Sequence, residues 1–281
     1  MSESKMDIDL LKTIALKVHE NVSPLMGTKE GAEELERGAG GDITMKIDTV
    51  AETTIIGELE RNRIDLLLIS EEVGHKYVGN KEKAQKKKSK LIVDPIDGST
   101  NSSRGIPFYS VSLAYAEGDS LNDIQTAVIL DLSTKDIYWA KRGSGAYHNG
   151  DNIAVSERGL SDQLIFEIDF YLWNLRKKLK LYRSLLAKLY RVRVMGSVAL
   201  SLCLVAEGGL DGYVDFRKGI RLVDIAAGYL MVKEAGGKIL NINGKELEHE
   251  LSKDFLMPLV VCNSNSELEQ FLKNILHKNT Q

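Results

Sequence analysis

Asp94-Pro95-Ile96-Asp97-Gly98-Ser99-Thr100 is the stretch on which the interpretation of this sequence depends. The three apolar residues before it, 91–93, predict a short buried strand that ends at the first aspartate. The proline favours extended backbone just before it, and the glycine permits a sharp turn. The serine and threonine are typical helix-capping residues, and the free N–H groups of a helix start favour an anion. We therefore predict a rigid corner with two carboxylates beside a phosphate-sized site, suited to a hard divalent cation.

The composition is that of a globular protein, with 281 residues of which 43% are hydrophobic and 27% charged. This length is enough for one large core or for two packed subdomains. The net charge of −3 provides no overall attraction to nucleic acid or to an anionic membrane. No apolar run approaches the roughly 20 residues that span a bilayer, and the N-terminus has no signal-peptide pattern. Cys203 and Cys262 lie in apolar runs and predict buried free thiols, which fits a reducing compartment. Together, these features predict a cytoplasmic protein without nucleic-acid or membrane partners.

The pattern of apolar residues changes near the middle of the chain. Residues 1–158 show helical spacing over 11–25 and 47–59, a buried strand over 66–69 and an antiparallel meander from 111 to 139. In residues 159–281, strands over 164–166, 192–194, 213–216 and 258–261 alternate with helices over 172–190, 197–208, 224–236 and 264–276. These patterns predict an α+β N-terminal subdomain and an α/β C-terminal subdomain.

Two segments are unusual in composition. Residues 38–42 are so rich in glycine that they predict a flexible loop. Residues 81–90 carry six lysines, which either attract phosphate or, as we expect, form a solvated connection between two strands.

Acidic residues stand at the ends of predicted strands and at a helix start, namely Glu71, Asp94, Asp97 and Asp224. Groups of polar residues at the carboxyl ends of strands are how α/β folds build their sites. Oxygen ligands without histidine or cysteine favour Mg²⁺ or Mn²⁺ over zinc. Taken alone, such an acidic residue is usually a helix cap or part of a solvated edge, and a cap is the simplest interpretation of Asp224 by itself.

Several ordered motifs together make the chain resemble the inositol monophosphatase family, within the superfamily that includes fructose-1,6-bisphosphatase. The resemblance runs from about residue 10 to residue 263. It implies a layered αβαβα sandwich of the sugar-phosphatase type, a Mg²⁺-dependent phosphomonoesterase activity and a homodimer. The motifs are Lys46-Ile47-Asp48 with Glu52, Ser70-Glu71-Glu72, the Asp94 to Thr100 corner, Gly196-Ser197-Val198-Ala199, and Val223 to Gly228 followed by Glu234-Ala235-Gly236-Gly237.

The resemblance implies a metal-ligand set. Glu71, Asp94 and the backbone carbonyl of Ile96 would hold one ion. Asp94, Asp97 and Asp224 would hold a second, so that Asp94 bridges the two. Glu71 would also support a third ion through water, and Mn²⁺ could replace Mg²⁺ in this oxygen-rich site.

The resemblance also implies roles in catalysis and substrate binding. Asp48 would hold metal-bound water, and the Ser99 hydroxyl, paired with Glu71, would orient the attacking water. Gly98 and Ser99 would donate backbone N–H groups to the phosphate. The substrate would also contact Gly196 and Ser197, together with Asp97 and Asp224. Residues 38–42 correspond to a mobile loop that closes over the metals.

The departures from the family pattern bear on the substrate. Inositol-specific members carry a glutamate seven residues before the position of Asp224, where this chain has Arg217. Arginine prefers a carboxylate or a second phosphate, so we expect a bisphosphate such as fructose 1,6-bisphosphate to be accepted along with inositol 1-phosphate. Four residues of the preceding basic segment either add contacts to the substrate or form a solvated helix face, namely Tyr171, Arg176, Arg191 and Arg193.

Two alternatives to this function remain open at the level of the sequence. A 3′-phosphoadenosine 5′-phosphate phosphatase would use the same chemistry but needs a pocket in which a base can stack. A non-catalytic family member would act as a binding protein. The presence of all four carboxylates of the implied metal site argues against this alternative.

Overall fold

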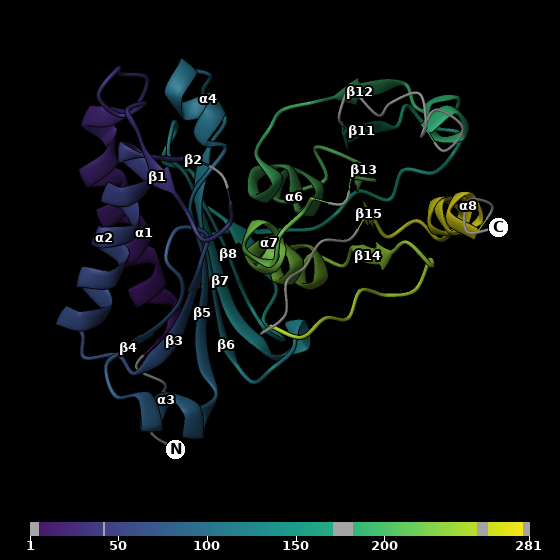
Figure 1. Ribbon diagram of the computed structural model, residues 1–281. Coiled ribbons are helices and arrows are strands. Elements are labelled where there is room, and N and C mark those ends of the chain that lie inside the picture. Colours follow the sequence, from purple (N-terminus) through teal and green to yellow (C-terminus); the bar gives the residue numbers. More distant parts are fainter. Residues whose placement is uncertain (1–5, 42, 171–181, 218, 252–257, 278–281) are drawn as a thin grey trace.

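The computed structural model arranges the chain in five alternating layers of helices and sheets (Figure 1). It describes residues 6–41, 43–170, 182–217, 219–251 and 258–277. A helical layer, an eight-stranded sheet, a second helical layer, a five-stranded sheet and a third helical layer follow one another across the molecule. This order confirms the αβαβα arrangement predicted from the sequence.

The first helical layer consists of α1 (Ile8–Val22) and α2 (Lys46–Arg61), which pack against one face of the eight-stranded sheet. α1 begins where Asp7 accepts a hydrogen bond from the backbone N–H of Leu10 at 2.9 Å, and its buried side is apolar. A 3₁₀ turn, η1 (Ser23–Leu25), ends it. A hairpin of β1 (Glu34–Arg37) and β2 (Ile43–Met45) then leads into α2.

The larger sheet contains one parallel pair of strands, which positions the site. β3 and β5 run parallel with Ser70 opposite Val93, and every other neighbouring pair in this sheet is antiparallel. The ends of β3 and β5 therefore reach the same edge of the sheet. In the strand order β10-β9-β8-β7-β6-β5-β3-β4, the bounds are β3 (Leu66–Ser70), β4 (Gly74–Val78), β5 (Ser89–Asp97), β6 (Ser110–Glu117), β7 (Ile124–Asp131), β8 (Ile137–Lys141), β9 (Ala146–His148) and β10 (Asp151–Ile153).

The middle layer consists of α6 (Val198–Ala206) and α7 (Leu222–Glu234), which lie between the two sheets. α7 contacts β5, β6, β7 and β8 on one side and β14 (Lys238–Asn241) on the other, so it is apolar around its circumference rather than on one stripe. Gly228 of α7 allows α6 to approach closely. A Cβ atom added to Gly228 would lie only 2.4 Å from Cδ1 of Leu202.

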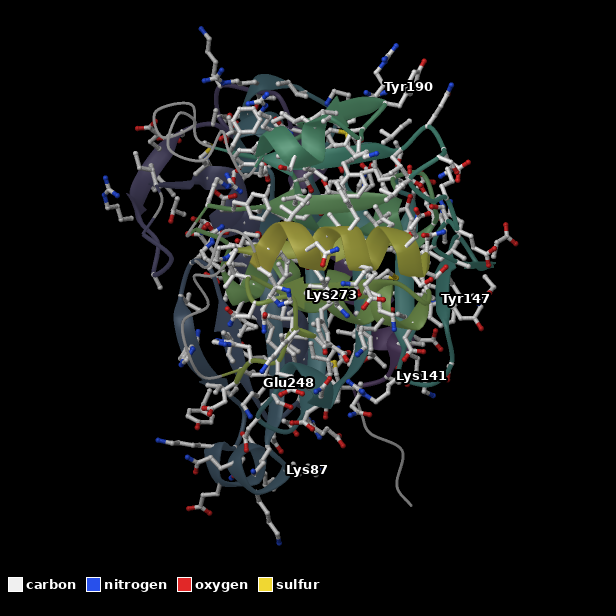
Figure 2. All side chains as sticks on the ribbon, turned by 90° about the vertical axis from the view of Figure 1, so that its right-hand side faces the viewer. Lys87, Lys141, Tyr147, Tyr190, Glu248 and Lys273 are labelled. Atoms are coloured by element: carbon white, nitrogen blue, oxygen red, sulfur yellow. The ribbon has the colours of Figure 1, made fainter. Side chains whose placement is uncertain are left out.

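The smaller sheet has the strand order β12-β11-β13-β15-β14. β11 (Ile165–Asp169) runs parallel to β12 (Arg191–Arg193) and β13 (Gly212–Asp215), and β15 (Leu259–Cys262) runs antiparallel to its two neighbours. α8 (Ser266–His277), which carries Lys273, lies across the outer face of this sheet (Figure 2).

Three details differ from the sequence-based expectations or extend them. Residues 81–90 are not a plain solvated connection, because α3 (Lys81–Lys87) forms there and Lys90 is buried with its Nζ 2.8 Å from Asp119 Oδ1. The hairpin β1–β2 and the strand β14 were not expected. The helix expected over 172–190 lies mostly outside the described residues; 182–186 are helical and a turn follows at 187–188.

Both cysteines are buried and free, which confirms the sequence-based expectation. Within the described part of the chain, no helix combines the length and the apolar character that crossing a membrane requires.

Candidate metal centre and active site

Three carboxylates meet at the edge where β3 and β5 end. Glu71 directly follows β3, Asp94 lies near the end of β5, and Asp224 lies in the first turn of α7. One oxygen atom from each of these residues lies within 4.8 Å of the oxygens of the other two. The family resemblance implied this convergence, although Asp94 and Asp224 are 130 positions apart in the sequence.

These carboxylates are held in a poorly solvated environment. Asp94 is 1% exposed, and burial raises its pKa well above the usual range, as do the neighbouring charges of Glu71, Asp97 and Asp224. Burial also raises the pKa of Glu71 to about 7, against the opposing effect of Arg221. A divalent cation would reverse these shifts, because it stabilises the ionised carboxylates. The cluster of hard oxygen donors therefore fits a metal ion of the Mg²⁺ or Mn²⁺ type.

Asp97 faces the same site, but both of its carboxylate oxygens already accept hydrogen bonds from the start of α6. Oδ2 accepts from the Ser197 hydroxyl and from the Ala199 backbone N–H, each at 2.6 Å, and Oδ1 accepts from the Val198 N–H at 3.2 Å. Burial raises the pKa of Asp97 to about 7 although these hydrogen bonds oppose the shift. Asp97 thus joins the larger sheet to the middle helical layer.

Asp48 has one carboxylate oxygen that makes no hydrogen bond to the described part of the chain. Its Oδ2 accepts a hydrogen bond from the Met45 backbone N–H at 2.7 Å, while its buried Oδ1 has no hydrogen-bond partner among the described residues. Burial is the main cause that raises the pKa of Asp48 to about 8, and the charges of Glu72 and Glu71 add to it. A buried acceptor without a donor, on a residue that lines a polar cavity, is what a residue that holds a water molecule would show.

The corner after Asp94 is built as the sequence predicts, with one correction. The Ile96 N–H donates to Asp94 Oδ1 at 3.1 Å, and Gly98 has φ +97°, a conformation in which a Cβ would lie 3.0 Å from the Phe108 carbonyl oxygen. Gly98, not Ser99, is the residue that precedes the short helix α4 (Ser99–Arg104). The Ser99 hydroxyl donates to the Ile96 carbonyl at 3.2 Å, and its pairing with Glu71 stays a prediction.

The loop before α6 is held from two sides. Ser197 caps α6 by accepting from the Leu200 N–H at 3.4 Å, and Gly196 precedes it with φ +86°. From the larger sheet's side, Asn101 donates to the Met195 carbonyl at 2.7 Å. From the smaller sheet, buried Glu167 accepts from the Met195 N–H at 2.9 Å.

The glycine-rich loop of the hairpin lies directly over the residues that follow β3. The Ala39 N–H donates to the Glu72 carbonyl at 2.9 Å, and the Gly40 N–H donates to the Glu71 carbonyl at 2.8 Å. A Cβ on Gly40 would lie 3.0 Å from Nη1 of Arg221, so a glycine there permits the close approach. The loop therefore covers one side of the carboxylate cluster, and Asp42 lies outside the described residues.

These residues surround a cavity of about 730 Å³. Ser197 lies behind its wall, and the other site residues predicted from the sequence line it: Asp48, Glu71, Asp94, Ile96, Asp97, Gly98, Ser99, Gly196, Arg217 and Asp224. Arg37 and Arg221 also line it, and sequence analysis did not single them out. The only sequence signal for Arg221 is its position three residues before Asp224, where side chains on a helix start can meet.

The basic residues proposed for the substrate differ in their placement. Arg217 lines the cavity, but its Nε donates to Asp215 Oδ2 at 2.8 Å and its Nη2 donates to Asp169 Oδ2 at 3.1 Å. Arg191 and Arg193 are exposed on β12, beside Tyr190 at the rim of the smaller sheet, and do not belong to the described lining of the cavity (Figure 2). Tyr171 and Arg176 lie outside the described residues.

The fold and this site can be compared with those of known proteins. A sequence model of the inositol monophosphatase family matches residues 3–281. The chain belongs to this family. A fructose-1,6-bisphosphatase/inositol-1-monophosphatase of Methanothermobacter thermautotrophicus is 35% identical over 286 residues, covering 98% of this chain and 99% of the relative. A bifunctional NADP phosphatase/NAD kinase of Methanococcus maripaludis is 32% identical, covering 95% of this chain but 49% of the relative.

Solved structures of family members share the architecture. The crystal structure of an inositol monophosphatase-fructose 1,6 bisphosphatase has a TM-score of 0.82 at 29% identity, covering 96% of this chain and all of the other. A Thermotoga maritima inositol monophosphatase has a TM-score of 0.77 at 27% identity, covering 96% of this chain and 98% of the other. As a member of the inositol monophosphatase family, the protein is a phosphatase, and its acidic cluster agrees with the metal dependence general in that family.

Proposed function

We propose that this phosphatase is a Mg²⁺-dependent phosphomonoesterase that hydrolyses fructose 1,6-bisphosphate, inositol 1-phosphate or both. The observation that carries the proposal is the oxygen-only cluster of Glu71, Asp94 and Asp224, whose ligand atoms lie within 4.8 Å of one another. Hard oxygen donors of this kind suit Mg²⁺, and Mn²⁺ as a substitute. The name of the Methanothermobacter relative, which includes both activities, supports the choice of substrates.

The proposed ligands are those that the family resemblance implies, and three of them form the cluster described above. Glu71, Asp94 and the Ile96 carbonyl would hold one ion, and Asp94, Asp97 and Asp224 a second, with a third near Glu71. Bound divalent cations supply an activated water and stabilise the leaving oxygen of an in-line displacement. Since both Asp97 oxygens accept hydrogen bonds from α6, this residue would serve the ion and the helix at once.

The remaining residues would position water and substrate. Asp48 Oδ1, buried and without a partner among the described residues, would accept a hydrogen bond from a water. The Ser99 hydroxyl would orient the attacking water, and the backbone N–H groups of Gly98 and Ser99 would hold the phosphate. Gly196 would line the wall of the site toward the substrate, with Ser197 behind it. We also propose a homodimer, in keeping with the family resemblance, which size-exclusion chromatography with light scattering would test.

The test is a phosphate-release panel with purified protein and Mg²⁺. Its substrates are fructose 1,6-bisphosphate, inositol 1-phosphate, 3′-phosphoadenosine 5′-phosphate and NADP. We expect release from the first two and little from the nucleotides, because the described cavity lining contains no aromatic ring on which a base could stack. Release from 3′-phosphoadenosine 5′-phosphate alone would favour the alternative phosphatase. Metal binding without release from any ester would favour a binding protein.

Asp94→Asn tests the metal assignment within the same panel. Loss of the bridging carboxylate should cost at least about 3 kcal/mol of transition-state stabilisation, or roughly a 100-fold fall in phosphate release. Circular dichroism would show that the fold is retained, since the substitution removes a buried charge rather than a packed apolar group. Unchanged phosphate release in this variant would refute the assignment.

The same panel tests whether Arg217 selects a second phosphate. The guanidinium of Arg217 is already bonded to Asp215 and Asp169. It selects a second phosphate only if one of its N–H groups still reaches the substrate. In that case Arg217→Met changes the ratio of turnover between fructose 1,6-bisphosphate and inositol 1-phosphate. A ratio that falls about tenfold would support the selection. An unchanged ratio would exclude it.

A further inference from the structure

Arg221 is a cation that the chain itself places among the carboxylates. Its Nη1 contacts Glu71 Oε1, and its Nη2 and Nε lie 2.9 and 3.1 Å from Asp224 Oδ1. Glu71 belongs to the first half of the chain and Asp224 to the second. One guanidinium therefore joins two of the three residues whose oxygens form the metal cluster.

The position of this guanidinium is fixed at both ends of the side chain. Arg221 is the residue that precedes α7, and its backbone N–H donates to Asp224 Oδ2 at 2.7 Å. At the other end, a Cβ on Gly40 would lie 3.0 Å from Nη1, so the hairpin loop lies against the guanidinium. The side chain is 25% exposed, while those of Glu71 and Asp224 are 10% and 8% exposed. Charge-assisted hydrogen bonds are strong in such a partly buried place.

A divalent cation requires the same carboxylate oxygens. An oxygen that accepts N–H groups from a guanidinium offers fewer lone pairs to a metal, and two cations held a few ångströms apart repel one another. We propose that Arg221 competes with the divalent cation for Glu71 and Asp224, and so lowers the metal affinity of this site. Binding of the ion is then an exchange of one cation for another, coupled to the movement of a single side chain.

The opposite role is physically reasonable and predicts the opposite sign. If Arg221 only orients the two carboxylates for the metal, removing it should weaken metal binding, as loss of an orienting partner does at other metal sites. Competition predicts that removing the guanidinium strengthens binding. The sign of the change in affinity therefore decides between the two roles.

The experiment is isothermal titration calorimetry with Mg²⁺ alone, and with Mn²⁺ alone, on full-length protein freed of metal with a chelator. Arg221→Met keeps the apolar stem of the side chain and removes the charge. We expect the variant to bind both ions about tenfold more tightly, within the 5- to 150-fold range typical of coupling between two bound species. Without metal, we expect it to unfold at a lower temperature than the wild type, because two buried carboxylates lose their partner.

Arg217→Met is the matched control. Arg217 lines the same cavity and is also paired with two carboxylates, but Asp215 and Asp169 do not belong to the three-carboxylate cluster. Its loss should change the metal affinity less than about twofold. Should Arg221→Met not fold, Arg221→Lys keeps the charge but cannot bridge both carboxylates with a planar fork, and we expect a smaller gain in affinity.

Metal affinity that is unchanged or weaker in Arg221→Met, or in Arg221→Lys where that variant is used, would overturn the proposal, as would an equal gain in Arg217→Met. The proposal rests on the metal assignment of the proposed function, but its readout involves no substrate. A wild-type protein that releases no phosphate from any ester would contradict the proposed function, while tighter binding in Arg221→Met would still establish the competition.

Discussion

Asp48 illustrates how burial at this site leads to a pH-dependent stability. Its folded-state pKa of about 8 arises mainly from burial, against the hydrogen bond from Met45. The ordinary pKa of an aspartate is about 3.9, so the folded protein binds this proton more tightly than the unfolded chain does. The stability associated with the protonated carboxyl is therefore present below about pH 4 and is lost as the pH rises through about 8.

Asp48→Asn removes this dependence, because an amide does not ionise. Both melting temperatures are measured in the presence of a chelator. We expect the melting temperature of the variant minus that of the wild type to increase as the pH rises from about 5 to about 8. The comparison needs only thermal denaturation at a series of pH values. A difference between the two proteins that stays constant over this range would show that Asp48 titrates normally in the folded state.

Site residues that follow a local sequence pattern could be predicted, whereas those placed by long-range packing could not. Glu71 and Asp94 each come at or near the end of a short apolar run that predicts a buried strand, so their place at a sheet edge could be predicted from local sequence. Arg221 could not be found in this way. Its contact with Glu71 joins positions that are 150 residues apart, and only the packing of α7 against the larger sheet brings them together.

At the scale of elements, the start of α6 is the place where the two sheets are tied to one another. Asp97 from β5 accepts hydrogen bonds from the first residues of α6, and Glu167 from β11 accepts from the loop before it. Glu167 is fully buried and also accepts from the Ser201 hydroxyl at 2.5 Å. One carboxylate thus satisfies several donors that have no access to water.

Glu167→Ala should therefore destabilise the protein much more than removal of one of its donors. The substitution leaves the Met195 N–H and the Ser201 hydroxyl without this acceptor, at a cost of about 2–3 kcal/mol or roughly 3–5 °C in melting temperature. Ser201→Ala removes one donor and leaves Glu167 bonded to the loop, so we expect less than about half of that loss. Equal losses in thermal denaturation would contradict the role assigned to Glu167.

Element prediction succeeded where apolar periodicity is long and failed where elements are short. The helices α1, α2 and α6 and the strands β6, β7 and β8 agree with the predicted ranges. The strands of the hairpin have four and three residues and lie beside a run of glycines, which leaves no periodicity to recognise. In α3 the lysines suggested a solvated connection, whereas the decisive local signal is Asn80, whose side chain accepts from the Lys83 N–H at 2.9 Å and caps the helix.

At the scale of the whole molecule, the largest of the three buried apolar clusters among the described residues contains side chains from both halves of the chain. The largest buried cluster contains Ile92 and Ala114 from the larger sheet together with Leu202 and Tyr229 from the middle helices and Val261 from the smaller sheet. The sequence predicted the elements of residues 1–158 and 159–281 but not which faces meet, because α6 and α7 are apolar on all sides and carry no directional pattern.

Because this largest cluster contains side chains from both halves, we expect the two halves to unfold together. Residues 1–158 alone would expose to water the apolar face of the larger sheet that α7 covers. The hydrophobic stabilisation from burying that face would be lost. We expect scanning calorimetry of the full chain to show a single transition, with a van't Hoff enthalpy equal to the calorimetric one and a value of about 200 kcal/mol near 60 °C for 281 residues. We expect the fragment 1–158 to aggregate or to lack a cooperative transition. Two separate transitions in the full chain, or a fragment that melts cooperatively by itself, would show instead that each half has a self-sufficient core.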